Sequence, residues 1–109
     1  MADQANDNLT WLTYWYSAQC NGEWEHDYGV VIETLDNPGW LLKIDLTYTD
    51  LAGRPFETVA VNMVAPDGDP SARWYHCKVE GELFQASGGV HDLTTILGVF
   101  RIWAEGPQH

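Results

Sequence analysis

The chain has 109 residues, of which 45% are hydrophobic, enough for one domain with one core. It carries 5 Lys and Arg residues against 16 Asp and Glu residues, which gives a net charge of −11. A protein that binds nucleic acid or an anionic membrane needs the opposite sign, so neither is expected as a partner. The charge favours a basic protein partner, because complementary fields steer two proteins together. The alternative is that the acidic residues serve only to keep the protein in solution.

The N-terminal segment and the two cysteines bear on the compartment. No apolar run approaches the ~20 residues of a membrane helix. The first residues, MADQANDN, lack the basic and apolar regions of a signal peptide. We therefore expect a cytoplasmic protein in which residues 1–6 form a frayed end. Because disulfides are rare in that compartment and no CxxC motif is present, Cys20 and Cys77 are expected as small buried side chains.

A first helix is predicted near the N-terminus. Asp7 or Asn8 is its expected cap, and the helix runs to about Cys20, where Asn21-Gly22 stops it. Its apolar stripe is wide and aromatic, so this helix should lie on a sheet. The stripe contains Leu9, Leu12 and Tyr16, with Trp11, Trp15 and Ala18 beside them.

A second helix is predicted at the C-terminal end, after Ser87-Gly88-Gly89. His91 or Asp92 is its expected cap, and Gly106-Pro107 ends it. This helix has the clearest helical period of the chain. The period runs through Leu93, Ile96, Leu97, Phe100, Trp103 and Ala104.

Five strands are predicted between the two helices. Apolar and β-branched patterns predict strands over residues 28–35, 40–47, 56–64, 73–79 and 83–86. The first two form a hairpin around Asn37-Pro38-Gly39, a predicted type II turn in which Gly39 takes the positive φ. In the second strand, one face carries Trp40, Leu42, Ile44 and Leu46.

The order of these elements predicts a single α+β domain over residues 1–109. Consecutive strands joined by short turns imply an antiparallel meander, because parallel neighbours need long crossovers. We expect an antiparallel sheet of four or five strands with the N- and C-terminal helices packed on one face. The other face of the sheet is then open to a partner.

Glu25, His26 and Asp27 stand at the entrance to the first strand, where a metal or acid–base site could use them with His76 or His91. A zinc site needs three or four ligands that converge on one point. Adjacent residues of an extended segment point in different directions, and no HxxxH spacing is present. The simpler interpretation is that Glu25 and His26 anchor the hairpin by hydrogen bonds. We therefore expect no metal, no cofactor and no catalytic residue.

A small enzyme, either a hydrolase or a sulfurtransferase, is the alternative. Cys20 would need cationic surroundings to act as a nucleophile, but it ends a helix and precedes Glu23 and Glu25. Carboxylate pairs such as Glu33 with Asp45 are not excluded by their spacing. A deep pocket with convergent titratable groups would distinguish an enzyme from a binding protein.

The residues Trp24-Glu25-His26, Tyr28-Gly29-Val30, Asp36-Asn37-Pro38-Gly39-Trp40 and Ile44-Asp45-Leu46 carry a resemblance. Together they resemble the Imm53 family of immunity proteins from bacterial polymorphic toxin systems. The similarity extends over nearly the whole chain, and the run from Asp36 to Trp40 is its most specific part. It implies an antidote that binds a cognate toxin and blocks it by stoichiometric occlusion, with no turnover. A structural or adaptor domain without a toxin is a further alternative.

Charge and predicted facing, and not the resemblance, select the candidate binding surface. A nuclease toxin must present basic residues to phosphates, and an acidic inhibitor could cover that surface. The acidic open face of the sheet is therefore the expected site for a basic toxin. Its candidates are Glu33, Asp45 and Glu57, with Glu23, Glu25 and Asp27 at its edge and Asp67 and Asp69 in the nearby loop.

Overall fold

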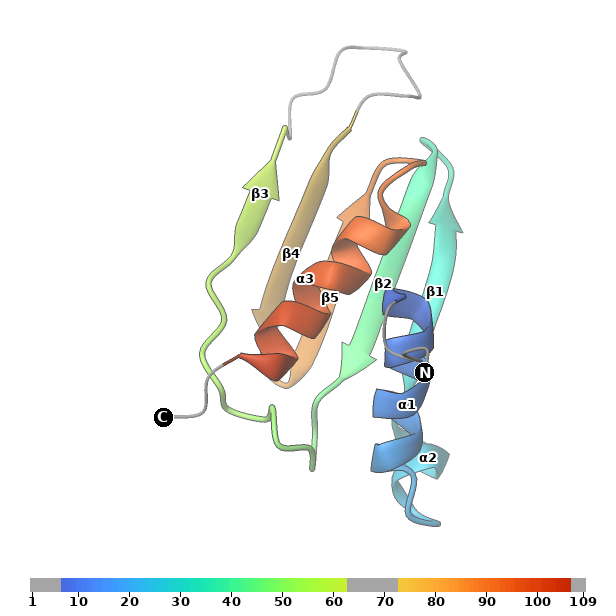
Figure 1. Ribbon diagram of the computed structural model, residues 1–109, viewed down its shortest axis with the longest axis vertical. Helices are drawn as coiled ribbons and strands as arrows, with labels where there is room; N and C mark the ends of the chain where they lie inside the picture. The colour runs from blue at the N-terminus through green and yellow to red at the C-terminus, as the bar shows by residue number, and fades with distance from the viewer. Residues whose placement is uncertain (1–6, 63–72, 107–109) are drawn as a thin grey trace.

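The structure is a computed structural model and describes residues 7–62 and 73–106. Its elements are α1 (Asn8–Gln19), α2 (Trp24–Asp27), β1 (Val30–Leu35), β2 (Gly39–Asp45), β3 (Val59–Val61), β4 (Tyr75–Glu80), β5 (Leu83–Gly88) and α3 (Leu93–Glu105). The predicted α+β class is confirmed, since one five-stranded antiparallel sheet carries α1 and α3 on the same face (Figure 1). None of the helices in the described ranges is long and apolar enough to cross a membrane. The frayed end predicted for residues 1–6 lies outside the described residues.

The strand order is β1-β2-β5-β4-β3, which differs from a meander in chain order. Two hairpins, β1-β2 and β4-β5, lie side by side because β2 pairs with β5. Residues 46–58 carry the chain from β2 to the far edge, where β3 pairs with β4. Such a connection is longer than the 2–5 residues typical of a hairpin loop, and this length is the signal that the predicted meander overlooked.

The core lies between the sheet and the helices. The predicted alternation of β2 is confirmed, because Leu42, Ile44 and Leu46 are buried. Leu42 pairs with Ala86 of β5, and the helix face of the sheet continues to Cys77 of β4. The fully buried side chains of α3 that close this core are Ile96 and Phe100, with Leu97 almost completely buried.

Trp11 and Trp15 attach α1 to this core. Their rings lie 5.9 Å and 5.1 Å from the ring of Phe100 in edge-to-face geometry. Asp7 begins the helix as predicted, because its carboxylate accepts the N–H groups of Leu9 and Thr10. The helix packs through one side of its wide apolar stripe against α3 (Figure 1), and its Leu12 joins the buried cluster that contains Leu42 and Ile44 of β2.

Gly39 departs from its predicted role. It is the first residue of β2, and its φ is not positive, so the expected type II geometry is wrong at this position. A Cβ on Gly39 would stand 2.4 Å from the carbonyl oxygen of Gly88 in the paired strand β5. Close approach of two strands, and not a left-handed backbone, is what this glycine permits.

Candidate partner-binding surface

A short helix, α2, replaces the extended entrance predicted before β1. The side-chain oxygen of Asn21 accepts the N–H groups of Glu23 and Trp24, both at 2.9 Å, and so starts the helical turn. The indole of Trp24 is buried and donates to the carbonyl of Thr47 at 2.8 Å. Four residues are too few to show a helical period, and a polar Asn just before the turn was the available signal.

Glu25 anchors this turn. Its two carboxylate oxygens accept the backbone N–H groups of Asn21 at 3.0 Å and Gly22 at 2.9 Å. Its own backbone N–H first, and then those of Asn21 and Gly22, lower the pKa of the Glu25 carboxyl. Glu25 is therefore a hydrogen-bonded anchor of the turn between α1 and α2, and not of the hairpin as predicted. Glu23 and Asp27 on either side of it are exposed.

The open face of the sheet is mixed in charge and not uniformly acidic. Cross-strand register places Glu33 in the same row as Leu41 and Ser87, on the face away from the helices. The next row contains Lys43 and Lys78 on either side of Gln85. Two of the chain's few cations thus lie in the middle of the face, and the acidic character predicted for it is limited to its margins.

The candidate acidic residues divide into separate groups. Asp45 lies on the open face and accepts the N–H of Gly29 at 3.0 Å, next to the start of β1. Glu57 lies in the connection before β3, at the opposite edge of the sheet from β1. Asp67 and Asp69 are outside the described residues. The described candidates therefore gather mainly near the start of β1, around α2 and Asp45.

Tyr28 lies near acidic residues from several elements at that end. Its pKa is raised, first by desolvation and then by Tyr48, Asp27, Asp45 and Glu82. The acidic residues of α2, β2 and the β4–β5 turn therefore act on one place, although they are far apart in the sequence. A cation brought to this end of the molecule would meet several carboxylates at once.

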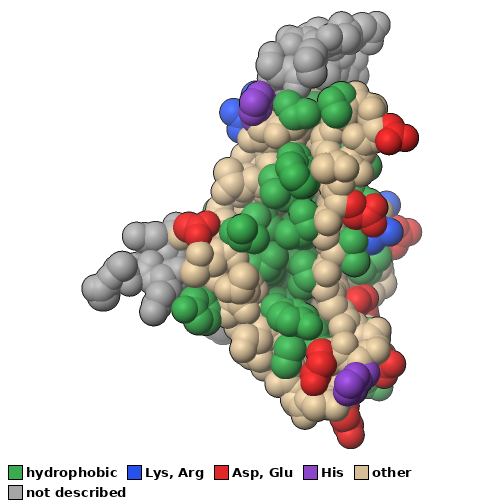
Figure 2. Space-filling view, turned by 90° about the vertical axis from the view of Figure 1, so that its right-hand side faces the viewer, with side chains coloured by type: hydrophobic (Ala, Val, Ile, Leu, Met, Phe, Trp, Pro, Cys, Tyr) green, Lys and Arg blue, Asp and Glu red, His purple; other side chains and the backbone are tan. Residues whose placement is uncertain are grey.

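An apolar groove lies between α1 and β1 and was not predicted from the sequence. Its volume is about 480 Å³, and its lining residues are Leu9, Leu12, Thr13, Tyr16, Tyr28, Gly29, Val30 and Ile32. Figure 2 faces this side of the molecule and shows hydrophobic side chains in a continuous strip, with acidic side chains along its margins and at its lower end. Leu9 is 49% exposed and Ile32 is 37% exposed, so the groove is open to a partner.

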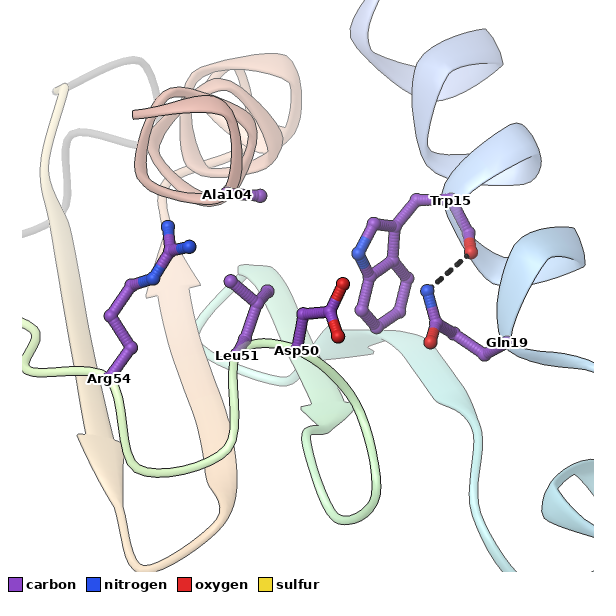
Figure 3. A pocket seen from close by; sticks show the side chains of 6 residues that line it. All are labelled: Trp15, Gln19, Asp50, Leu51, Arg54 and Ala104. Atoms are coloured by element: carbon purple, nitrogen blue, oxygen red, sulfur yellow. Dashed lines mark hydrogen bonds between the residues drawn. The ribbon is translucent and has the colours of Figure 1, made fainter. Parts of the chain in front are cut away.

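A second hollow lies between α1, α3 and the connection after β2. It has a volume of about 490 Å³ and is lined by Trp15, Gln19, Asp50, Leu51, Arg54 and Ala104 (Figure 3). Arg54 is turned toward α3, where it donates to the carbonyl of Trp103 at 2.9 Å. Asp50 and Arg54 are the titratable groups of this lining.

The cysteines and histidines of the described residues do not form a cluster. Cys20 and Cys77 are free, and burial raises the pKa of the Cys77 thiol to about 12. Cys20 contacts the carbonyl of Tyr16 at 3.3 Å. Among residues 7–62 and 73–106, no three His, Cys, Asp or Glu side chains are grouped as metal ligands would be. The described residues therefore offer a groove with acidic margins as the strongest candidate site.

Comparison with known proteins adds one match. The family model described as immunity protein 53 (Imm53) matches residues 9–105. No curated protein and no solved structure gives a match. The matched range covers α1 from its second residue, α2, α3 and the whole sheet, and therefore every element that lines the groove.

Proposed function

The chain belongs to the Imm53 family of immunity proteins, and from this premise we propose that it binds one cognate polymorphic toxin in the cytoplasm and blocks it by stoichiometric occlusion. The family implies a toxin protein as the partner. In this proposal residues 1–109 act as one immunity domain without turnover and without a cofactor. The family match over nearly the whole chain is the observation that carries the proposal.

Charge supports a basic toxin, with a nuclease as the proposed class. The chain has a net charge of −11, and a nuclease needs basic residues where it holds phosphates. An acidic protein that covers those residues blocks access of the nucleic acid and is steered to them by charge. In the described residues, Glu23, Glu25 and Asp27 of the α2 segment, together with Glu33 and Asp45, are the proposed acidic contacts. Glu57 lies at the opposite edge of the sheet and is not included among these contacts, and Asp67 and Asp69 stay predictions.

The proposal expects a toxin gene beside the gene of this protein, and the toxin domain encoded there can be used to test neutralisation. Co-expression of the two chains in a bacterium should restore growth that the toxin alone abolishes. In the purified system, nuclease activity should fall linearly as the chain is added and reach zero at one equivalent of a tight complex. A toxin that kills equally well with and without this chain would remove the proposal.

Recovery of the toxin separates occlusion from an enzymatic antidote. The complex is unfolded in denaturant, the two chains are separated, and the toxin is refolded and weighed by mass spectrometry. Occlusion predicts an unmodified toxin that regains its activity. A covalently changed toxin, or inactivation of many equivalents by one chain, would show turnover instead.

A further inference from the structure

The strand β1 forms an open edge of the sheet. It pairs with β2 on one side and is the first strand of the order β1-β2-β5-β4-β3. The N–H of Asp45 donates to the carbonyl of Gly29 at 3.0 Å, which makes residues 29 and 45 a hydrogen-bonded pair. In an antiparallel ladder such pairs recur at every second residue. The backbone groups of residues 31, 33 and 35 therefore face β2, and those of Val30, Ile32 and Thr34 face outward.

No other described segment pairs with this outer side. None of the hydrogen bonds between described segments joins the backbone groups of Val30, Ile32 or Thr34 to a loop or helix. The four residues 31–34 are all exposed, although three of the six residues of β1 are Val or Ile. An apolar, six-residue edge with free backbone groups is a template on which another strand can add.

The apolar groove runs beside the same edge. Val30 and Ile32 point to the helix side of the sheet, where they line the groove with Leu9 and Tyr16 of α1. Successive side chains of a strand point to opposite faces. A strand added beside β1 would therefore place every second side chain in the groove, under α1, and the others on the open face.

Charge selects the occupant of this site. On the open face the added strand would pass Glu33, and at the start of β1 it would meet the acidic residues Asp27 and Asp45. A second copy of this chain would bring another net charge of −11 and the same acidic margin to the edge. Self-pairing is therefore opposed, whereas a basic segment with alternating apolar residues is complementary on both faces.

We infer that β1 and the groove between α1 and β1 dock an extended segment of the cognate toxin, which adds to the sheet as a strand beside β1. This inference rests on the proposed function. Apolar side chains of that segment fill the groove, and basic side chains alternate with them on the side of Glu33. The backbone of Val30, Ile32 and Thr34 provides the hydrogen bonds, and the groove and Glu33 provide the selectivity.

Amide hydrogen exchange of each residue, followed by NMR, tests the added strand directly. In the free chain the outward amides of Val30, Ile32 and Thr34 should exchange quickly, while those of residues 31, 33 and 35 are already protected. Addition of the toxin domain encoded beside this gene should slow the outward amides by about tenfold or more, as expected for newly paired strands. Slowing of the same amides by raising the concentration of this chain alone would identify a second copy as the occupant and overturn the inference.

Ile32→Pro tests the edge strand together with one side chain of the groove, whereas Leu9→Lys tests the groove alone. Ile32→Pro removes one outward N–H and leaves the ladder to β2 intact, a position where an edge strand tolerates proline. Leu9→Lys places a cation at the groove. Ile102→Lys is the matched control, because Ile102 is an exposed hydrophobic residue of α3 (74% exposed) that does not line the groove.

The dissociation constant for the same toxin domain should rise about tenfold or more for Ile32→Pro and Leu9→Lys, and should stay within about twofold for Ile102→Lys. Circular dichroism and urea unfolding confirm that each variant is folded, and Leu9→Lys is a surface change that tests the groove even where Ile32→Pro does not fold. Parent-like affinity of Leu9→Lys, or unchanged exchange of the outward amides in the complex, would overturn the inference while neutralisation by the parent chain still stands. Failure of the parent chain itself to bind would overturn the proposed function.

Discussion

At the scale of single residues, Gly39 shows how one position is constrained by a strand that is distant in the sequence. A Cβ at Gly39 would meet the carbonyl oxygen of Gly88 at 2.4 Å, a contact that only a shift of backbone can relieve. Gly39→Ala should therefore lower the free energy of unfolding by about 1–3 kcal/mol, the usual range for overpacking. Urea unfolding followed by tryptophan fluorescence measures this change.

Gly29→Ala is the matched control, since a Cβ there has nothing within 4 Å and its φ is not positive. It should change the free energy of unfolding by less than about 0.5 kcal/mol, as is usual at open surface positions. Gly39→Asn separates the two explanations of Gly39. Asn tolerates a positive φ but not a close backbone contact, so a stable Gly39→Asn variant would contradict the steric explanation.

Asp92 is another residue whose position was predicted and whose role was not. It precedes α3 as expected and its carbonyl accepts the N–H of Ile96. Its side chain makes no helix cap and is 0% exposed. One carboxylate oxygen lies 2.5 Å from the guanidinium of Arg73, and the other accepts the N–H of Trp74 at 3.1 Å. Sequence spacing predicts that Asp92 lies next to a helix. Only the tertiary fold brings its side chain to Arg73 and Trp74, which directly precede β4.

At the scale of elements, the α2 turn links stability to pH through Glu25. Its pKa is lowered because backbone N–H groups, its own first, donate to the carboxylate. A group whose folded pKa lies below its unfolded value stabilises the fold above the unfolded pKa, about 4.3 for Glu, and loses this contribution as the pH falls through the folded pKa. Stability of the parent should therefore fall as the pH is lowered from about 5 toward 3.

Glu25→Gln removes this titration. The difference in unfolding free energy between the parent and Glu25→Gln should be largest near neutral pH and should shrink as the pH falls below about 4. Glu23→Gln is the control, because the Glu23 carboxylate accepts no hydrogen bond from the residues that the structure describes. Thermal unfolding from pH 7 to pH 3 makes the comparison. If the difference in unfolding free energy were the same at every pH, the hydrogen bonds to Glu25 would not stabilise its charged form more than its neutral form.

The elements that depend on local pattern were predictable, and those that depend on distant contacts were not. The helix period of α3 and the alternation of β2 come from neighbouring residues, and both are confirmed. Placement of β5 beside β2 depends on where a long connection leads, which no local pattern contains. The groove has the same origin. The helical pattern placed Leu9 and Tyr16 in a stripe that was predicted to be buried. In the structure only Leu12 of α1 is buried, and Leu9 and Tyr16 line the groove instead.

At the scale of the whole molecule, the net charge was predictable from the sequence, but the positions of the charges on the surface were predictable only in part. The net charge of −11 follows from composition alone. Lys43 and Lys78 become neighbours of Gln85 only when β2 and β4 both pair with β5. Strand order thus places cations in the middle of the open face and leaves the start of β1, with α2 and Asp45, as the most acidic place near an open edge. Charge and apolar surface therefore coincide on the β1 side of the molecule.

Association with a basic toxin should consequently slow as salt is added. Exposed charges are screened beyond about 8 Å at physiological ionic strength, so steering is weakened first. Replacement of both Asp27 and Glu33 by Lys changes the charge beside β1 and leaves Asp45, which holds Gly29, in place. This double variant should lower the association rate constant by about tenfold or more at low salt and should affect the dissociation rate constant less.

The control places the same kind of change at the other edge of the sheet. Glu57→Lys, before β3, should reduce the association rate constant by no more than about twofold, because it alters net charge but not the field beside β1. Stopped-flow mixing with the neighbouring gene's toxin domain, from about 20 mM to 500 mM salt, measures both constants across the range over which screening grows. A rate constant independent of salt, or an equal effect of Glu57→Lys, would show that the charge around β1 does not guide the encounter. The toxin would then be held by the edge strand and the groove without electrostatic steering.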